Sequence, residues 1–184
     1  MYNGKDKRAP MASAPMQYRD NGEVAWGEMW GSFCALALEG GPPHRGEMLV
    51  AQPVPDTHSP TYQLAVQEIV RGIREVSGLP ATEVRPGWIG VTCPSSAMAG
   101  WLAEAIVSEN VEAHTEANLL LVPVGDYYTL KGEIKNVITA VAKTTHYWGE
   151  HLSAEVKQTL ALHAKLVGFW TWVRRLGKST PERT

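Results

Sequence analysis

The chain has 184 residues, enough for one domain with a sizeable core, and its 44% hydrophobic and 20% charged content is ordinary for a globular protein. A formal net charge of −2 is unlike the basic surface of a dedicated nucleic-acid-binding protein, although it leaves room for a local anion site. The start of the chain has no apolar signal-peptide core, and no later apolar run has the length that crosses a bilayer, so we expect a cytoplasmic protein with no membrane span.

The first fifty residues are expected to contain a tail, a helix and a rigid connection. Residues 1–20 combine Pro, Ala, Ser and mixed charge without apolar periodicity, which predicts a disordered tail. Apolar and aromatic side chains then recur at helical spacing, which predicts a helix over residues 24–38. Two glycines and two prolines end this helix in the segment LEGGPPHRGEML, residues 38–49, and a short strand is expected over residues 47–52.

The centre of the chain predicts a β-α-β-β unit that follows a helix. That helix covers residues 60–77, because Ser59 is a good N-cap, Pro60 suits a first helical position, and a glycine and a proline come after it. Residues 78–87 are then expected to form a loop. The unit itself is predicted as a buried strand at 88–93, a helix at 94–109, and two strands at 111–115 and 118–124 joined by a tight turn.

Two more helices are predicted to complete the fold. The first covers residues 130–151, and its apolar stripe consists of Leu130, Ile134, Val137, Ile138, Val141 and Trp148. The second begins after Ser153 and reaches about residue 176, and residues 177–184 are expected to fray. Residues 21–176 are therefore expected to form a single globular α/β (α+β) domain, in which a single-layer mixed sheet of about four strands is packed by about five helices.

The segment GGPPHRG is the first candidate site. The glycines allow left-handed backbone angles and the prolines restrict φ, so the chain that enters His44 and Arg45 is stiff. Such a loop could present Arg45 to a carboxylate or phosphate and His44 as a catalytic acid or base. The alternative is a helix stop and a rigid turn in which Arg45 pairs with an acidic neighbour.

A polar stripe on the predicted helix 130–151 is the second candidate. Lys135, Thr139, His146 and Glu150 follow one another along one face, and Asn136 lies beside them. Lys135 and Asn136 could bind an anion, and His146 could act as a catalytic acid or base. The alternative is a solvated helix face. We expect a functional site only if this helix brings Lys135 or His146 to the loop at His44 and Arg45.

Metal binding and thiol chemistry are weaker hypotheses. His146 and Glu150 share a helix face, but His151 should point away from His146 on a regular helix and no further ligand is near in sequence, so no metal site is expected. Two cysteines are too few for a disulfide framework. Cys93 ends a predicted strand before a helix, where the helix N-terminus could lower the pKa of its thiol, although a small buried residue is the simpler interpretation.

The C-terminal segment is rich in tryptophan. Residues 166–176 carry Phe169, Trp170 and Trp172 next to two arginines, a composition typical of subunit interfaces. We therefore expect a homo-oligomer that associates through this segment. A fully buried terminal helix and a membrane-surface element are the alternatives.

Two hypotheses of different classes follow from these features. The first is a small cytoplasmic protein that binds an anionic metabolite or cofactor, of a kind that the sequence does not identify, and that could be an enzyme using His, Arg and Lys for acid–base chemistry. The second is a non-enzymatic oligomerisation or adaptor module built on the C-terminal helix. A thiol-redox protein acting through Cys93 is a distant third.

Overall fold

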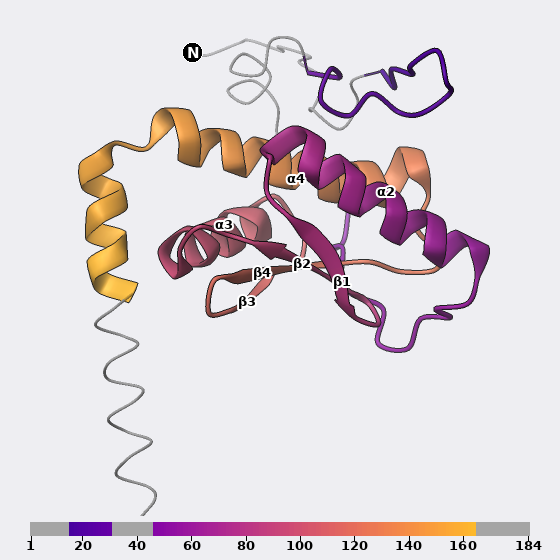
Figure 1. Cartoon of the computed structure of the whole chain (residues 1–184). Coiled ribbons are helices and arrows are strands. Elements are labelled where there is room, and N and C mark those ends of the chain that lie inside the picture. Colours follow the sequence, from indigo (N-terminus) through magenta and orange to yellow (C-terminus); the bar gives the residue numbers. More distant parts are fainter. Residues whose placement is uncertain (1–14, 31–45, 165–184) are drawn as a thin grey trace, which may run out of the picture.

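A four-stranded sheet with helices over one face forms the centre of the protein in the computed structural model, which describes residues 15–30 and 46–164 (Figure 1). The strands are β1 (Ala81–Arg85), β2 (Trp88–Thr92), β3 (His114–Glu116) and β4 (Leu119–Pro123), in the order β1-β2-β4-β3. The labelled helices are α2 (Pro60–Ser77), α3 (Ser96–Ser108) and α4 (Lys135–His146). The fold is α+β, and the predicted β-α-β-β unit is confirmed as β2, α3, β3 and β4.

The strand pairing differs from the mixed sheet that we expected. All three pairs of neighbouring strands are antiparallel. The predicted strand over residues 47–52 is reduced to a single parallel bridge between Leu49 and Val111, and the side chain of Val50 next to it is exposed. Because this isolated bridge is not part of the four-stranded sheet, the sheet itself is purely antiparallel.

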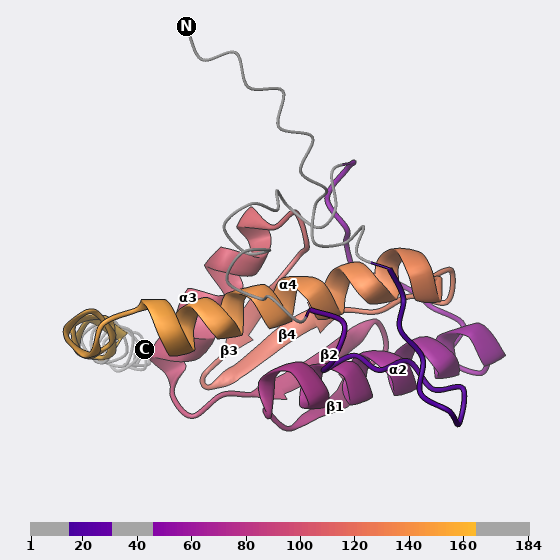
Figure 2. The same ribbon diagram turned by 90° about the horizontal axis from the view of Figure 1, so that it is seen from above.

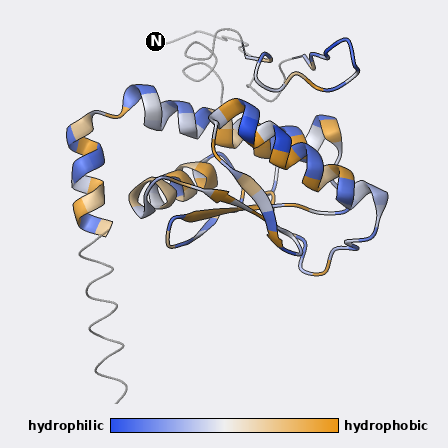
Figure 3. Cartoon of the chain, viewed as in Figure 1, coloured by the Kyte–Doolittle hydropathy of each residue, from blue (hydrophilic) through white to orange (hydrophobic). Residues whose placement is uncertain are grey.

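Each strand of the central pair turns one set of side chains toward the helices. Ile89 pairs with Val122 and Val91 with Leu120, so these four side chains share a face, and all four are fully buried in the core. In Figure 3 hydrophobic residues gather where the helices and the sheet face one another, while the outer surface of α2 is hydrophilic. The sheet is therefore covered on one face by the described helices.

Strand β1 occupies part of the chain that we expected to be a loop. Only Ala81 of its five residues is buried, so the strand lacks the apolar alternation that would predict it. It pairs with β2 through a hairpin in which Gly87 adopts φ +84°. The Tyr62 hydroxyl of α2 donates to Glu83 at 2.6 Å and accepts from the Gly87 N–H at 2.9 Å, which ties the hairpin to the helix.

The helix boundaries follow from local capping. Ser59 accepts a hydrogen bond from the Tyr62 N–H and Gly78 ends α2 in the left-handed region, as predicted. Ser95 caps α3 in the same way by accepting from the Met98 N–H, so this helix begins two residues after the expected Pro94. Between β3 and β4, residues 117–118 form the predicted tight turn.

The long predicted helix is confirmed, with an irregularity at each end. One π-helical turn, Leu130–Ile134, precedes α4 and a second, Tyr147–His151, follows it. Helix α4 packs against both α2 and α3 (Figure 2). Because of this central position the middle of α4 is buried on all sides. The alternative interpretation of the polar stripe, a solvated helix face, is therefore wrong at Lys135, which is 4% exposed, and at Thr139, which is fully buried.

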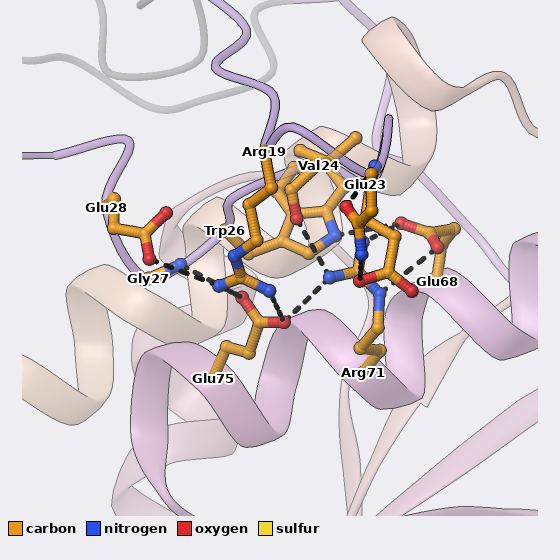
Figure 4. A network of polar contacts seen from close by, with 10 residues as sticks. Arg19, Glu23, Val24, Trp26, Gly27, Glu28, Glu68, Arg71 and Glu75 are labelled. Carbon is orange, nitrogen blue, oxygen red and sulfur yellow. Dashed lines mark hydrogen bonds and ion pairs between the residues drawn. The ribbon is translucent and has the colours of Figure 1, made fainter.

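The segment from residue 15 to 30 is held against α2 without being helical. The predicted helix over 24–38 is wrong for residues 24–30, which form turns, and its remaining residues lie outside the described chain. Trp26 and Trp30 are nevertheless buried, as a core position requires. Arg19 forms an ion pair with Glu75 at 3.0 Å, so the expected tail over residues 1–20 does not include Arg19 (Figure 4).

The last described element is a helix over residues 154–164. Ser153 accepts a hydrogen bond from the Val156 N–H at 3.3 Å, which agrees with its predicted role as N-cap. Residues 166–176 lie outside the described chain, and the subunit interface expected there stays a prediction. Within residues 15–30 and 46–164, no helix has the length and apolar character needed to cross a membrane.

Candidate functional site

The expected anion site combined a loop at His44 and Arg45 with the helix that carries Lys135 and His146, and the structure describes only the helix. His44 and Arg45 lie outside the described chain. Lys135 and His146 are the first and the last residue of α4, which places them about 16 Å apart along the helix axis. A small molecule therefore cannot contact both side chains in one compact site, and a meeting between the loop and either of them stays a prediction.

Lys135 lies in the interior of the protein. Its residue is 4% exposed, and burial lowers the pKa of the ammonium group because a desolvated charge is disfavoured. Asn136, the neighbouring candidate, is half-buried. The helical spacing placed both residues correctly on α4, but the packing of α4 between two helices turned the expected open binding surface into an interior one.

His146 and Glu150 do share a cavity, as their spacing indicated. This cavity of about 150 Å³ lies between the end of α2 and the end of α4, and its lining residues are Val76, Ser77, Ala142, Thr145, His146, Gly149 and Glu150. The ring of His151 lies 5.3 Å from the ring of His146, centroid to centroid. The expectation that His151 points away is wrong. The end of the helix forms a π turn, whose backbone hydrogen bonds join residues five positions apart instead of four, and this wider turn brings the side chains of residues i and i+5 onto the same face.

The metal and thiol hypotheses gain no support from the described residues. Among those residues, no group of three or more His, Cys, Asp and Glu side chains is arranged to hold a metal ion. Cys93 is 1% exposed, and burial raises the pKa of its thiol to about 11. The hypothesis of a lowered pKa is therefore wrong and the simpler interpretation, a small buried residue, is confirmed, since Cys93 lies in the core and the side chain that caps α3 belongs to Ser95.

A larger cavity lies on the other side of α4, where α3 packs against this helix. We call it the α3–α4 cavity, and its volume is about 320 Å³. It is lined by Trp101, Ala105, Ser108, Glu109, Lys143, Thr144 and Tyr147. These residues come from the middle and the C-terminal end of α3, from the last turn of α4 and from the start of the second π turn.

An ion pair forms the polar part of the α3–α4 cavity. The Lys143 ammonium lies 2.6 Å from Glu109 Oε1, and the two side chains are only 11% and 13% exposed. The second carboxylate oxygen, Glu109 Oε2, is buried and has no hydrogen-bond partner among the described residues. A buried carboxylate oxygen without a donor is unusual in folded proteins, and this oxygen lies beneath the wall of the cavity, out of contact with solvent.

Two hydroxyl groups of the α3–α4 cavity, those of Ser108 and Thr144, are committed as donors. Ser108 Oγ donates to the Glu104 carbonyl at 3.0 Å, and Thr144 Oγ1 donates to the Ala140 carbonyl at 2.8 Å. Because each of these hydroxyl groups already donates its hydrogen to a backbone carbonyl, each can act toward a ligand only as a hydrogen-bond acceptor. Because Ser108 ends α3 and Glu109 is its C-cap, the partial negative charge of a helix C-terminus adds to this acceptor character.

The sequence contained signals for this cavity that our predictions did not use. Lys143 stands in the segment ITAVAKTT, where small and β-branched side chains surround it on every side, a pattern typical of a buried helix. Glu109 ends a helix, where a negative charge is unfavourable unless a cation is near. Neither signal identifies the partner, since the two residues are 34 positions apart.

The α3–α4 cavity thus combines a largely buried ion pair with two aromatic side chains, Trp101 and Tyr147. The side chains in it are held by two packed helices, so the site is preformed. Comparisons with protein-family models, with curated proteins and with solved structures find no match to this chain.

Proposed function

We propose that this protein binds a small polar organic molecule in the α3–α4 cavity. The observation that carries the proposal is the largely buried pair of Lys143 and Glu109, which lines a cavity of about 320 Å³. This volume lies at the lower end of the range typical of ligand sites, about 300–1,000 Å³, and so suits a small ligand.

The energetics of the pair support a role in binding. Burying an ammonium and a carboxylate costs several kcal/mol of solvation per ion, and apolar side chains at the same positions would often give an equally stable contact. The pair at Lys143 and Glu109 is therefore better explained by the ligand that it contacts than by stability. This proposal keeps the small-ligand hypothesis and moves its charged residue from Lys135 to Lys143.

Binding is favoured over catalysis at this site. Among the described residues, the cavity lining contains no histidine or cysteine, and its ionisable groups are the paired Lys143 and Glu109 together with Tyr147. His146, the candidate acid or base, lines the separate cavity on the α2 side of α4. An enzymatic role of His146 or His44 stays a prediction, and so does the anionic ligand expected at Arg45 and Lys135.

The test is to fill the cavity and measure binding. A panel of small aromatic amines, alcohols and carboxylates is screened against the full chain by ligand-observed NMR. We expect at least one class to bind, and its binding to be lost in Ala105→Phe, because Ala105 lines the cavity and the added ring occupies it.

Val107→Phe is the matched control for this test. It introduces the same ring on the same helix, at a residue that is 38% exposed and does not line the α3–α4 cavity. Binding should persist in this variant. A panel without any binder, or binders that Ala105→Phe leaves unaffected while its fold is intact by circular dichroism, would overturn the proposal.

A further inference from the structure

We infer that the C-terminal segment of this protein, residues 154–176, binds the surface of an anionic lipid bilayer as an amphipathic helix that lies along that surface. The inference is independent of the α3–α4 cavity and goes beyond the proposed function. It puts a membrane surface in place of the subunit interface that the composition of residues 166–176 suggested. Three observations support it: the exposure of the described helix, the pattern of apolar residues and the charge of the segment.

The helix over residues 154–164 is mostly exposed. It lies at one end of the molecule in both views and turns away from the direction of α4 (Figures 1 and 2). None of residues 154–164, the last that the structure describes, is buried. A helix of this length is marginal in water by itself, so a further surface that covers it would stabilise it.

The side of this helix that points away from the body carries Leu162. The half-buried residues fall on one side of the helix, and they are Lys157, Leu160, Ala161 and Ala164. The Lys157 ammonium lies 5.8 Å from the centroid of the Trp148 ring, so this side faces the body. Leu162 falls on the opposite side and is 63% exposed. An apolar stripe that includes Leu162 is therefore directed toward something other than the body of its own chain.

The sequence continues this stripe beyond the described residues. Large apolar residues recur at alternating spacings of four and three, and they are Leu162, Leu166, Phe169, Val173 and Leu176. On a helix of 3.6 residues per turn, these positions stay within about 40° of Leu162. Trp170 and Trp172 fall about 80° to either side of Leu162, at the two borders of the stripe. Tryptophan at such borders is typical of helices that lie between lipid and water.

The charge of the segment favours an anionic surface. Residues 153–178 contain five basic residues and one acidic residue, so their net charge is +4, whereas the rest of the chain carries −6. Arg174 and Arg175 fall about 120° and 140° from Leu162, outside the stripe, where they can contact lipid headgroups while the stripe is in the apolar layer. Two copies of so basic a segment would repel one another, so an anionic bilayer suits the stripe better than a second copy of it.

The test measures binding of the full chain to lipid vesicles by co-sedimentation. One set of vesicles is phosphatidylcholine alone, and the other contains phosphatidylcholine and phosphatidylserine in a ratio of about 7:3. We expect binding to the second set to be at least tenfold tighter, because each basic residue near an anionic surface adds to the affinity. Added salt should weaken this binding, since it screens the attraction.

Two substitutions by glutamine distinguish insertion of the stripe from attraction between charges. Phe169→Gln places a polar amide in the centre of the stripe and should weaken binding to the anionic vesicles at least tenfold, because a large apolar side chain no longer leaves water. Thr171→Gln is the matched control. It introduces the same side chain on the opposite side of the helix and should change the affinity less than twofold.

A third variant tests the basic residues. Arg174→Gln combined with Arg175→Gln should weaken binding to the anionic vesicles at least tenfold and should change binding to phosphatidylcholine vesicles little. An equal loss on both sets of vesicles would contradict the role of the two arginines in recognising anionic lipid.

The outcomes separate a bilayer from other partners of the segment. If the natural chain does not bind the anionic vesicles, or if Phe169→Gln binds them equally well, the inference fails. Light scattering of the lipid-free protein tests a second copy as the partner, and we expect the same mass for the natural chain and for Phe169→Gln. A dimer that Phe169→Gln converts to a monomer would overturn the inference, because the stripe would then be covered by a second copy. Ligand binding in the α3–α4 cavity is measured separately, so the proposed function does not depend on these results.

Discussion

At the scale of single residues, burial sets the chemistry of Cys93. Its thiol is 1% exposed, and desolvation raises its pKa from 9.0 to about 11. A thiol with a raised pKa in the folded state contributes stability that is complete below the pKa of the unfolded state, near 9, and that is lost as the pH rises through about 11.

We therefore expect alkaline conditions to destabilise the protein through Cys93. Between about pH 9 and pH 11 the free energy of unfolding should fall by about 2–3 kcal/mol more in the natural chain than in Cys93→Ala. Urea unfolding measured over this pH range checks the difference. Cys34 is present in both proteins and cancels, and equal pH dependence in the two would contradict the buried thiol.

At the scale of elements, Gly72 sets the distance between α2 and α4. A Cβ at Gly72 would overlap the Ile138 side chain of α4, whose Cγ1 would lie 2.9 Å away. We expect Gly72→Ala to destabilise the protein by about 1–3 kcal/mol, because two packed helices cannot make room for the extra methyl group without strain. Urea unfolding gives the change in free energy.

A double substitution and a matched glycine isolate this contact. Ile138→Ala costs stability by itself, but Gly72→Ala should cost much less in its presence, which a double-mutant cycle measures as a coupling energy. Gly100 of α3 is the control, since nothing lies within 4 Å of a Cβ built on it. Gly100→Ala should raise stability by about 0.5–1 kcal/mol through helix propensity. Additive effects of Gly72→Ala and Ile138→Ala would rule out the proposed overlap.

At the scale of the whole molecule, one arginine joins the N-terminal segment to the core. Arg71 of α2 bonds to Glu68 at 2.6 Å, to Glu75 at 2.7 Å and to the Val24 carbonyl at 2.8 Å (Figure 4). Glu68 also accepts from the Trp26 indole at 3.0 Å. Burial alone would raise the pKa of Glu75, but hydrogen bonds from Arg19, from the Gly27 N–H and from Arg71 lower it.

We expect Arg71→Met to loosen this segment specifically. The change removes one charged donor from each of two partly buried carboxylates, which keep their other donors, and removes the Arg71 donor of the Val24 carbonyl, which together should cost about 2–3 kcal/mol. Amide hydrogen exchange should rise most over residues 15–30. The control is Arg85→Met, because the pair of Arg85 with Glu116 is about half exposed and worth less than about 1 kcal/mol. A uniform rise in exchange along the chain would contradict the specific role of Arg71.

Local signals in the sequence were sufficient to predict those helices, strands and turns whose conformation is set by residues adjacent in the chain. Ser59, Pro60 and Gly78 mark the ends of α2 through capping and backbone preference. The apolar runs of β2 and β4 and the turn between β3 and β4 were predicted for the same reason, as was the helical span of residues 130–151. Each of these signals acts within a few residues, so one chain is enough to recognise it.

Three features that the local signals did not predict depend on long-range contacts or on an irregular helix end. Strand β1 exposes four of its five residues and exists because it pairs with β2 and because Tyr62 holds its hairpin. Residues 24–30 bury two tryptophans without a helix, since hydrogen bonds of Val24, Trp26 and Gly27 with side chains of α2 hold them in place. The ring of His151 meets that of His146 because the end of the long helix forms a π turn.

The sequence by itself determined the class of the fold, the ends of α2 and the residue types available for chemistry. Only the tertiary structure decided which of those residues form a site. Lys135 and His146 share a helix but lie at its two ends, whereas Lys143 and Glu109 are far apart in the chain and 2.6 Å apart in space. The physical reason is that capping and periodicity act over one or two helical turns, while a buried ion pair requires two helices to pack first.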